Sequence, residues 1–406
     1  MASASPTRES TDTIVAPRGW GRRASTWRVT PARPAFGLDP LPRADRELGG
    51  AEHRDRLVHH AFRGEVWGKA LAHLKDLDAV ASPAEVGEVM GVGADNPGPL
   101  WWGGEFERAA KAAERELAIA ASFGHFAGRV VASCRLAQAH LAVGDYARSA
   151  TTLRQVVAAL HGDLARQHFF GMASFPAVFA RSYLAWCLAE LGEFADGEAL
   201  GAEGVAIADS ADHAYSQGHV AHGLGTHYVI AERPDRAIAL LERGLVVARL
   251  ANIAFLFPFL GAALGAAHAL ARQFDRAQRL LEQAEGRRLL ANRSVWLTWL
   301  GRTHLVAGRP KDAEAVGRRA IELAVTQGER GQEAHARLLM ADVATVDDPD
   351  GAMTAYDDVL GMAGALGMRP VTAHAHLGLG AALRRTGAVA RANTSPPRRG
   401  CMPPWA

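Results

Sequence analysis

One short pattern recurs along most of this 406-residue chain, and it constrains the fold more than any other feature. Each copy begins with a leucine followed directly by a small residue, and a turn comes seven positions after the small residue. A ring residue, aromatic or proline in most copies, stands two positions after the turn, and a second small residue stands three positions after the ring. One copy reads Leu264, Gly265, Arg272, Phe274 and Ala277. The turns fall at residues 104, 144, 192, 232, 272, 308, 347 and 387, spaced by 40, 48, 40, 40, 36, 39 and 40 residues. A fixed period of this size, carried by helix-forming residues, predicts a stacked array of helix pairs.

The residue types in each copy suit a helix-turn-helix unit. The leucine fits between the two helices of a pair, and the small residue beside it, such as Gly225 or Gly301, allows the second helix to come close. Seven residues are about two helical turns. A glycine, or a turn that contains proline such as Arg233–Asp235, ends the first helix. The sequence lacks sustained two-residue alternation bounded by hairpin turns, so it predicts an all-α fold.

The repeats divide the chain into four expected regions. Residues 57–76 have the apolar spacing of a helix, whereas Gly87, Gly91, Gly93 and the run Asn96-Pro97-Gly98-Pro99 interrupt the repeat that should follow. The expected regions are a disordered N-terminal segment at 1–56, a helical stub with a degenerate first repeat at 57–100, a solenoid at 101–392, and a disordered tail at 393–406.

Composition limits the environment and the partners of the chain. The formal charge is only +2, which predicts no general attraction to nucleic acid. The longest apolar stretch, 253–270, is interrupted by Pro258 and His268, so we expect no membrane contact. Cys134, Cys187 and Cys401 have neither the spacing of a zinc site nor that of a disulfide framework, and they favour a reducing cytoplasm.

Several side chains have the chemistry of a catalytic or metal site without its pattern. His219, His222 and His227, with His213 nearby, lack the acidic or cysteine ligand that would complete a metal set. The chain has no phosphate-binding G-x-x-x-x-G-K-[ST] loop and no G-x-S-x-G nucleophile motif. We therefore expect no catalytic residue, no bound cofactor and no metal site, and we expect that the chain is not an enzyme.

Four segments carry a resemblance to a known family: 184–192 (LAWCLAELG), 237–245 (AIALLERGL), 299–305 (WLGRTHL) and 376–380 (HLGLG). They resemble tetratricopeptide repeats, and in particular the C-terminal repeats of large bacterial signalling proteins. In those proteins a class III nucleotide cyclase or DNA-binding domain precedes an AAA-type ATPase, and residues 59–74 resemble the helix after that ATPase. The resemblance implies a right-handed α-solenoid of about seven helix pairs.

The resemblance also implies where a partner would bind. In this repeat class the first helices line the concave surface, and we expect their inward positions thirteen, ten, six and three residues before each turn. The candidate groove residues are Phe179, Ser182, Trp186, His219, His222, Thr226, Phe259, Thr298, Arg302, Arg337, His374 and Arg384. A groove with aromatic and arginine side chains suits an extended peptide or a helix with acidic residues.

The expected function is a non-enzymatic interaction module, a regulatory scaffold in bacterial signal transduction that binds a protein or peptide partner in the cytoplasm. We expect no direct contact with nucleic acid, and the sequence leaves open homodimerisation through the solenoid. The alternative is a fragment of a cyclase–ATPase, or of an ATP-binding transcription regulator, that retains only the repeat region as a sensor. Binding of nucleotide by the purified chain would favour that alternative.

Overall fold

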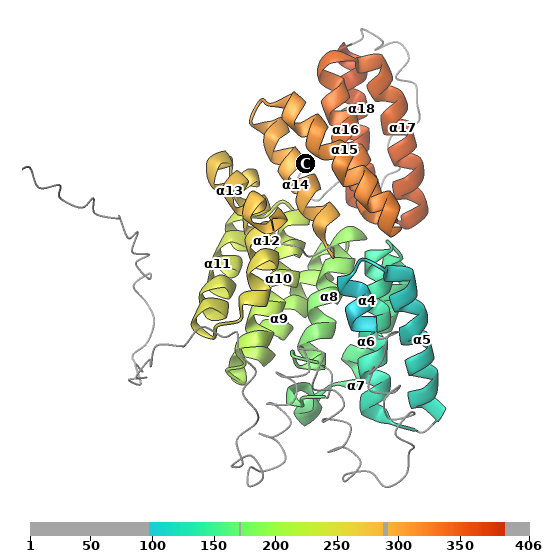
Figure 1. The fold of residues 1–406 in the computed structure, drawn as a ribbon, viewed down its shortest axis with the longest axis vertical. Helices are drawn as coiled ribbons and strands as arrows, with labels where there is room; N and C mark the ends of the chain where they lie inside the picture. Colours follow the sequence, from blue (N-terminus) through green and yellow to red (C-terminus); the bar gives the residue numbers. More distant parts are fainter. Residues whose placement is uncertain (1–96, 123, 170–171, 287–290, 386–406) are drawn as a thin grey trace, which may run out of the picture. The chain divides into compact units, whose positions relative to one another are not determined.

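The computed structural model describes residues 97–385 apart from 123, 170–171 and 287–290 (Figure 1). This part of the chain contains fifteen α-helices, two short 3-10 helices (η2 Gly162–Arg166 and η3 Ala254–Leu256) and no strand. The first helices of the pairs are α4 (Pro97–Trp102), α6 (Phe126–Ala142), α8 (Pro176–Glu190), α10 (Ala214–Ile230), α12 (Phe257–Leu270), α14 (Arg293–Val306), α16 (Arg330–Asp347) and α18 (Arg369–Arg385). The second helices are α5 (Phe106–Ser122), α7 (Tyr146–Ala159), α9 (Phe194–Ser210), α11 (Pro234–Leu250), α13 (Phe274–Glu285), α15 (Pro310–Gln327) and α17 (Pro349–Leu366). Consecutive helices pack in pairs, which confirms the expected solenoid of helix pairs.

Six of the eight expected turns have the left-handed backbone that ends a helix. The positive φ angles are +77° at Gly104, +87° at Gly144, +73° at Gly192, +54° at Glu232, +59° at Arg272 and +78° at Gly308. The turn near 347 forms differently, because α16 continues through Asp347 and the side chain of Asp348 accepts a hydrogen bond from Gly351 N at 3.0 Å. The turn at 387 lies outside the described residues.

The small residue of each repeat allows close helix packing. A Cβ atom on Gly225 would lie 2.5 Å from Leu241 Cδ2, and one on Gly265 would lie 2.8 Å from Leu281 Cγ. Such distances are far below van der Waals contact, so a larger residue at either position would require the facing leucine side chain to move.

The last repeats pack back onto the turns of the first ones. A Cβ on Gly144, in the α6–α7 turn, would lie 2.7 Å from the backbone nitrogen of Gly331, at the start of α16. The start of α18 contacts the α8–α9 turn, where Arg369 Nε donates a hydrogen bond to Leu191 O. We call this packing of α16 and α18 on the early turns the closure contact.

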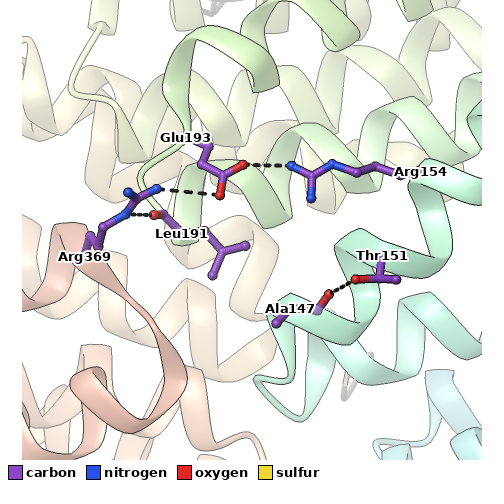
Figure 2. A network of polar contacts seen from close by, with 6 residues as sticks. All are labelled: Ala147, Thr151, Arg154, Leu191, Glu193 and Arg369. Carbon is purple, nitrogen blue, oxygen red and sulfur yellow. Dashed lines mark hydrogen bonds and ion pairs between the residues drawn. The ribbon is translucent and has the colours of Figure 1, made fainter.

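Figure 2 shows Glu193 between two arginines at the closure contact. Its carboxylate lies 2.8 Å from Arg154 Nη2 and 3.7 Å from Arg369 Nη2. In the same view Thr151 Oγ1 donates to Ala147 O within α7, at 2.9 Å. Half-exposed ion pairs contribute roughly 0.2–1 kcal/mol each, so we infer that the close packing of turns holds the contact more than charge does.

Helix α4 differs from the sequence-based expectation. The run Asn96-Pro97-Gly98-Pro99 was expected to interrupt a helix, yet α4 begins at Pro97, because proline lacks only an N–H that would be unpaired in the first turn anyway. The expected boundary at residue 101 therefore falls inside α4. The helix at 57–76, the segment 1–56 and the tail at 393–406 lie outside the described residues, and the four regions stay predictions. None of the helices in the described ranges is both long and apolar enough to cross a bilayer.

Candidate functional site

Six first helices (α8, α10, α12, α14, α16 and α18) contribute to a cavity of about 340 Å³. Its apolar walls include Trp186 of α8, Val295 and Trp299 of α14, and Val371 of α18. We call it the Arg302 cavity, after the arginine that α14 places in it. Its volume lies within the range of pockets that bind small ligands or side chains.

Helices α16 and α18 of the closure contact supply one wall of the Arg302 cavity, and a histidine from each binds one of the two carboxylates in the cavity, those of Glu190 and Glu232. His335 Nε2 of α16 lies 2.9 Å from Glu190 Oε2, and Glu190 Oε1 accepts a hydrogen bond from Trp186 Nε1 at 3.2 Å. His374 Nε2 of α18 lies 3.2 Å from Glu232 Oε1 and lowers the pKa of that carboxyl below its usual value. Both acids therefore already have partners within the protein.

The arginines of the cavity have no carboxylate bound to them. Arg302 is half-buried, and no described residue forms a hydrogen bond or ion pair with it, although its charge adds a smaller lowering of the Glu232 pKa. Arg272, at the rim, lies over the ring of Phe274 at 5.7 Å. The charge that is not neutralised by a direct contact is therefore positive, and the cavity suits an anionic group next to an apolar one.

A second, smaller cavity of about 40 Å³ lies among aromatic side chains of α4, α8, α10, η3 and α12. We call it the Trp102 cavity; its rings are those of Trp102, Phe179, Tyr183, Tyr215, His219, His222, Phe255 and Phe259. Burial lowers the pKa of His219 to about 3 and that of His222 to about 4, so both imidazoles are neutral at pH 7. Trp186 and His222 meet edge to face at 5.6 Å, which joins the walls of the two cavities.

Nine of the twelve candidate groove residues line one of the two cavities. Trp186, Thr226, Thr298, Arg302 and His374 line the Arg302 cavity, and Phe179, His219, His222 and Phe259 line the Trp102 cavity. The other three, Ser182, Arg337 and Arg384, line neither cavity.

Local packing explains the three exceptions. Ser182 is buried between α8 and α10, where its hydroxyl donates to His219 O at 3.0 Å. Arg337 pairs with Glu333 on its own helix at 2.6 Å, because α16 turns Gln332 and His335 toward the cavity instead. Arg384 is exposed in the last turn of α18.

Other residues that line the Arg302 cavity were not selected by the repeat rule, that is, by the positions thirteen, ten, six and three residues before each turn. Glu190 and Glu232 lie too close to their turns to fit it, and His335 lies on a different face of α16 from the expected one. The available signal was a charged residue, Glu190, at the end of the otherwise apolar helix α8.

The histidines considered as metal ligands do not converge. His227 turns away from the cavities, and its Nδ1 lies 3.0 Å from Ala185 O. His213 caps the start of α10, where it accepts from Ser216 N at 3.3 Å. Across the residues that the structure describes, no three His, Cys, Asp or Glu side chains lie together in a metal-binding arrangement.

A larger cavity of about 740 Å³ runs between the stacked turns of the closure contact. Its charged lining residues include Glu107, Lys111 and Arg330, which are exposed and therefore solvated. The Arg302 cavity, with a half-buried cation among aromatic walls, is the better candidate for a binding site.

Comparison with known proteins agrees with the fold. A family model described as a tetratricopeptide repeat matches residues 263–326 and 345–392. No curated protein matches the chain. The chain thus contains a tetratricopeptide-repeat region, and the matched segments include parts of α12, α14 and α18 that line the Arg302 cavity.

Proposed function

We propose that this tetratricopeptide-repeat chain is a non-enzymatic regulatory scaffold in signal transduction, and that it binds an acidic segment of a protein partner in the Arg302 cavity. Tetratricopeptide repeats generally mediate protein–protein interactions. The observation that carries the proposal is Arg302 itself, a half-buried guanidinium without a bound carboxylate in an aromatic-walled cavity.

The charge of Arg302 supports an acidic partner. A guanidinium that is partly withdrawn from water without a bound counter-ion loses some of its hydration, and a carboxylate from a partner would offset that loss with two parallel hydrogen bonds. Glu190 and Glu232 supply no such contact to Arg302, because each is bound to a histidine.

The walls of the cavity support an apolar neighbour for that carboxylate. Trp186 and Trp299 flank the space, and tryptophan and arginine are the residue types that dominate binding energy at protein interfaces. A volume of about 340 Å³ accommodates one or two side chains rather than a whole helix. The proposed ligand is therefore a short segment with an acidic residue beside an apolar one.

A displayed library of random short peptides, selected on the wild-type chain, tests the proposal. Arg302→Glu is the test variant. Arg337→Glu is the matched control, because Arg337 is an arginine on a neighbouring first helix that lies outside the cavity. We expect selected peptides rich in Asp and Glu that bind Arg302→Glu at least tenfold more weakly, about 1.4 kcal/mol, and bind Arg337→Glu as they bind the wild type.

Two results would contradict the proposal. One is a set of selected peptides without acidic residues. The other is equal weakening of binding by Arg302→Glu and Arg337→Glu, which would indicate a general charge effect rather than recognition in the cavity.

A further inference from the structure

Helix α4 contributes one side chain, that of Trp102, to the wall of the Trp102 cavity. The indole of Trp102 meets Phe255 edge to face at 4.7 Å and Phe259 at 5.7 Å. Phe259 belongs to α12 of the fifth helix pair and Phe255 to η3 just before it, whereas α4 belongs to the first pair. The space left beside the indole is about 40 Å³, little more than the volume of one water molecule.

The two tryptophans of α4 have different surroundings. Trp101 is 2% exposed and packs with Leu100, Phe106 and Ala139 in the core formed with α5 and α6. Trp102 is half-buried and lies on the concave side, against α12. Trp101 therefore anchors α4, while Trp102 reaches across the groove.

The walls around Trp102 are held together by contacts that do not involve it. Phe179 lies 4.6 Å from Tyr183 and 5.0 Å from His219, and His222 lies 5.6 Å from Phe259. Tyr183 also accepts a hydrogen bond from Gln138 Nε2 at 2.6 Å. The site would therefore keep its shape if the indole left it.

We propose that the place filled by the Trp102 indole, together with the Trp102 cavity beside it, is a second binding site in the groove, which takes an aromatic side chain of the partner, and that Trp102 occupies this place when no partner is bound. The indole that now sits there defines the chemistry of the site, a flat aromatic group between ring edges. Because Trp186 and His222 join the two cavities, a segment with an aromatic residue near an acidic one fills both. This inference rests on the proposed function for the identity of the partner.

The tether makes Trp102 a strong competitor. A group attached through a short linker acts at an effective concentration in the millimolar range. A ligand that binds only when the indole has left its place therefore has an affinity reduced in proportion to the fraction of molecules in which the indole is displaced. Removal of the indole should therefore raise the affinity for an aromatic ligand. An apolar cavity of about 150 Å³ is sufficient to hold a small aromatic ring.

The test uses the full chain and N-acetyl-L-tryptophanamide as the probe. We expect Trp102→Ala to bind the probe at least tenfold more tightly than the wild type, and Trp102→Phe, which keeps a ring in the site, to behave like the wild type. N-acetyl-L-leucinamide is the non-aromatic control and should show no such gain. Trp102→Leu replaces the alanine variant if the latter does not fold.

Displacement is measured in the wild type by amide hydrogen exchange. Saturating N-acetyl-L-tryptophanamide should speed exchange of the Trp101 and Trp102 amides of α4 and leave α5 unchanged. The proposal is overturned if Trp102→Ala binds the probe no more tightly than the wild type, if the leucine analogue gains equally, or if exchange in α4 does not respond. Arg302→Glu should not alter binding of this neutral probe, so failure of the acidic-partner proposal and failure of this one are distinguishable.

Discussion

Substitution of Glu329 tests the packing at the closure contact directly, because the carboxyl group of this residue is buried at the start of α16. The residue is 2% exposed, and its Oε2 has no hydrogen-bond partner among the described residues. It lies in the turn before Gly331, which packs against Tyr146 at the start of α7. Burial raises the pKa of Glu329 to about 8.

The raised pKa sets the direction and size of the effect. A carboxyl with a pKa of about 8 in the folded protein and 4.5 in the unfolded chain stabilises the fold fully below pH 4.5, and this contribution is lost as the pH rises through 8. The whole difference corresponds to about 5 kcal/mol as an upper value, and the part lost between pH 6 and pH 8 to about 2 kcal/mol.

The perturbation is Glu329→Gln, which keeps the shape of the side chain and removes its titration. We expect the free energy of unfolding of this variant, measured by urea denaturation, to gain about 2 kcal/mol on the wild type between pH 6 and pH 8. Glu322→Gln, at an exposed position of α15, is the control and should show no pH-dependent gain. A constant difference between Glu329→Gln and the wild type over this range would refute the argument that the folded protein keeps the carboxyl protonated.

Two further predictions concern the closure contact and the Trp102 cavity. Gly308→Ala should lower the free energy of unfolding by roughly 1–2 kcal/mol, because Gly308 has a positive φ angle. Gly144→Ala should lower it by more, because Gly144 also has a positive φ angle and in addition faces the backbone of Gly331; equal losses in thermal unfolding would contradict this. Burial lowers the pKa of His222 from 6.5 to about 4, so this residue should cost the wild type about 2 kcal/mol of its free energy of unfolding between pH 7 and pH 5. His222→Gln removes this titration, so the variant should lose less stability than the wild type over the same pH range. Urea denaturation at several pH values measures this effect, the exposed His376→Gln serves as the control, and an unchanged acid dependence in His222→Gln would count against a neutral buried imidazole.

The helix pairs and most of their turns follow from the sequence, because their causes are local. Gly144 and Gly192 adopt the left-handed conformation that ends a helix, and the repeat spacing located even Arg272, where the residue type alone gives no such signal. Helical periodicity predicts that Trp186, Thr226 and Arg302 lie on the inner side of their helices, and all three line the Arg302 cavity.

The composition of the site was less predictable, because it depends on residues that the chain brings together from far apart. Glu190 and His335 are 145 residues apart in the sequence, yet they share a contact in the wall of the Arg302 cavity. The repeat rule placed Arg337 in the groove, but the packing of α16 at the closure contact directs His335 there instead.

The sequence by itself determined the class of fold, most of the helix ends and the inner face of first helices such as α8, α10 and α14, since these depend on residues within one or two repeats. Only the tertiary structure decided that the last repeats return to the first turns, that Glu190 and Glu232 are bound to histidines while Arg302 is not, and that Trp102 occupies the aromatic part of the groove. The physical reason is that small rotations between neighbouring repeats accumulate along a solenoid, so contacts several repeats apart are set by their sum rather than by any local pattern.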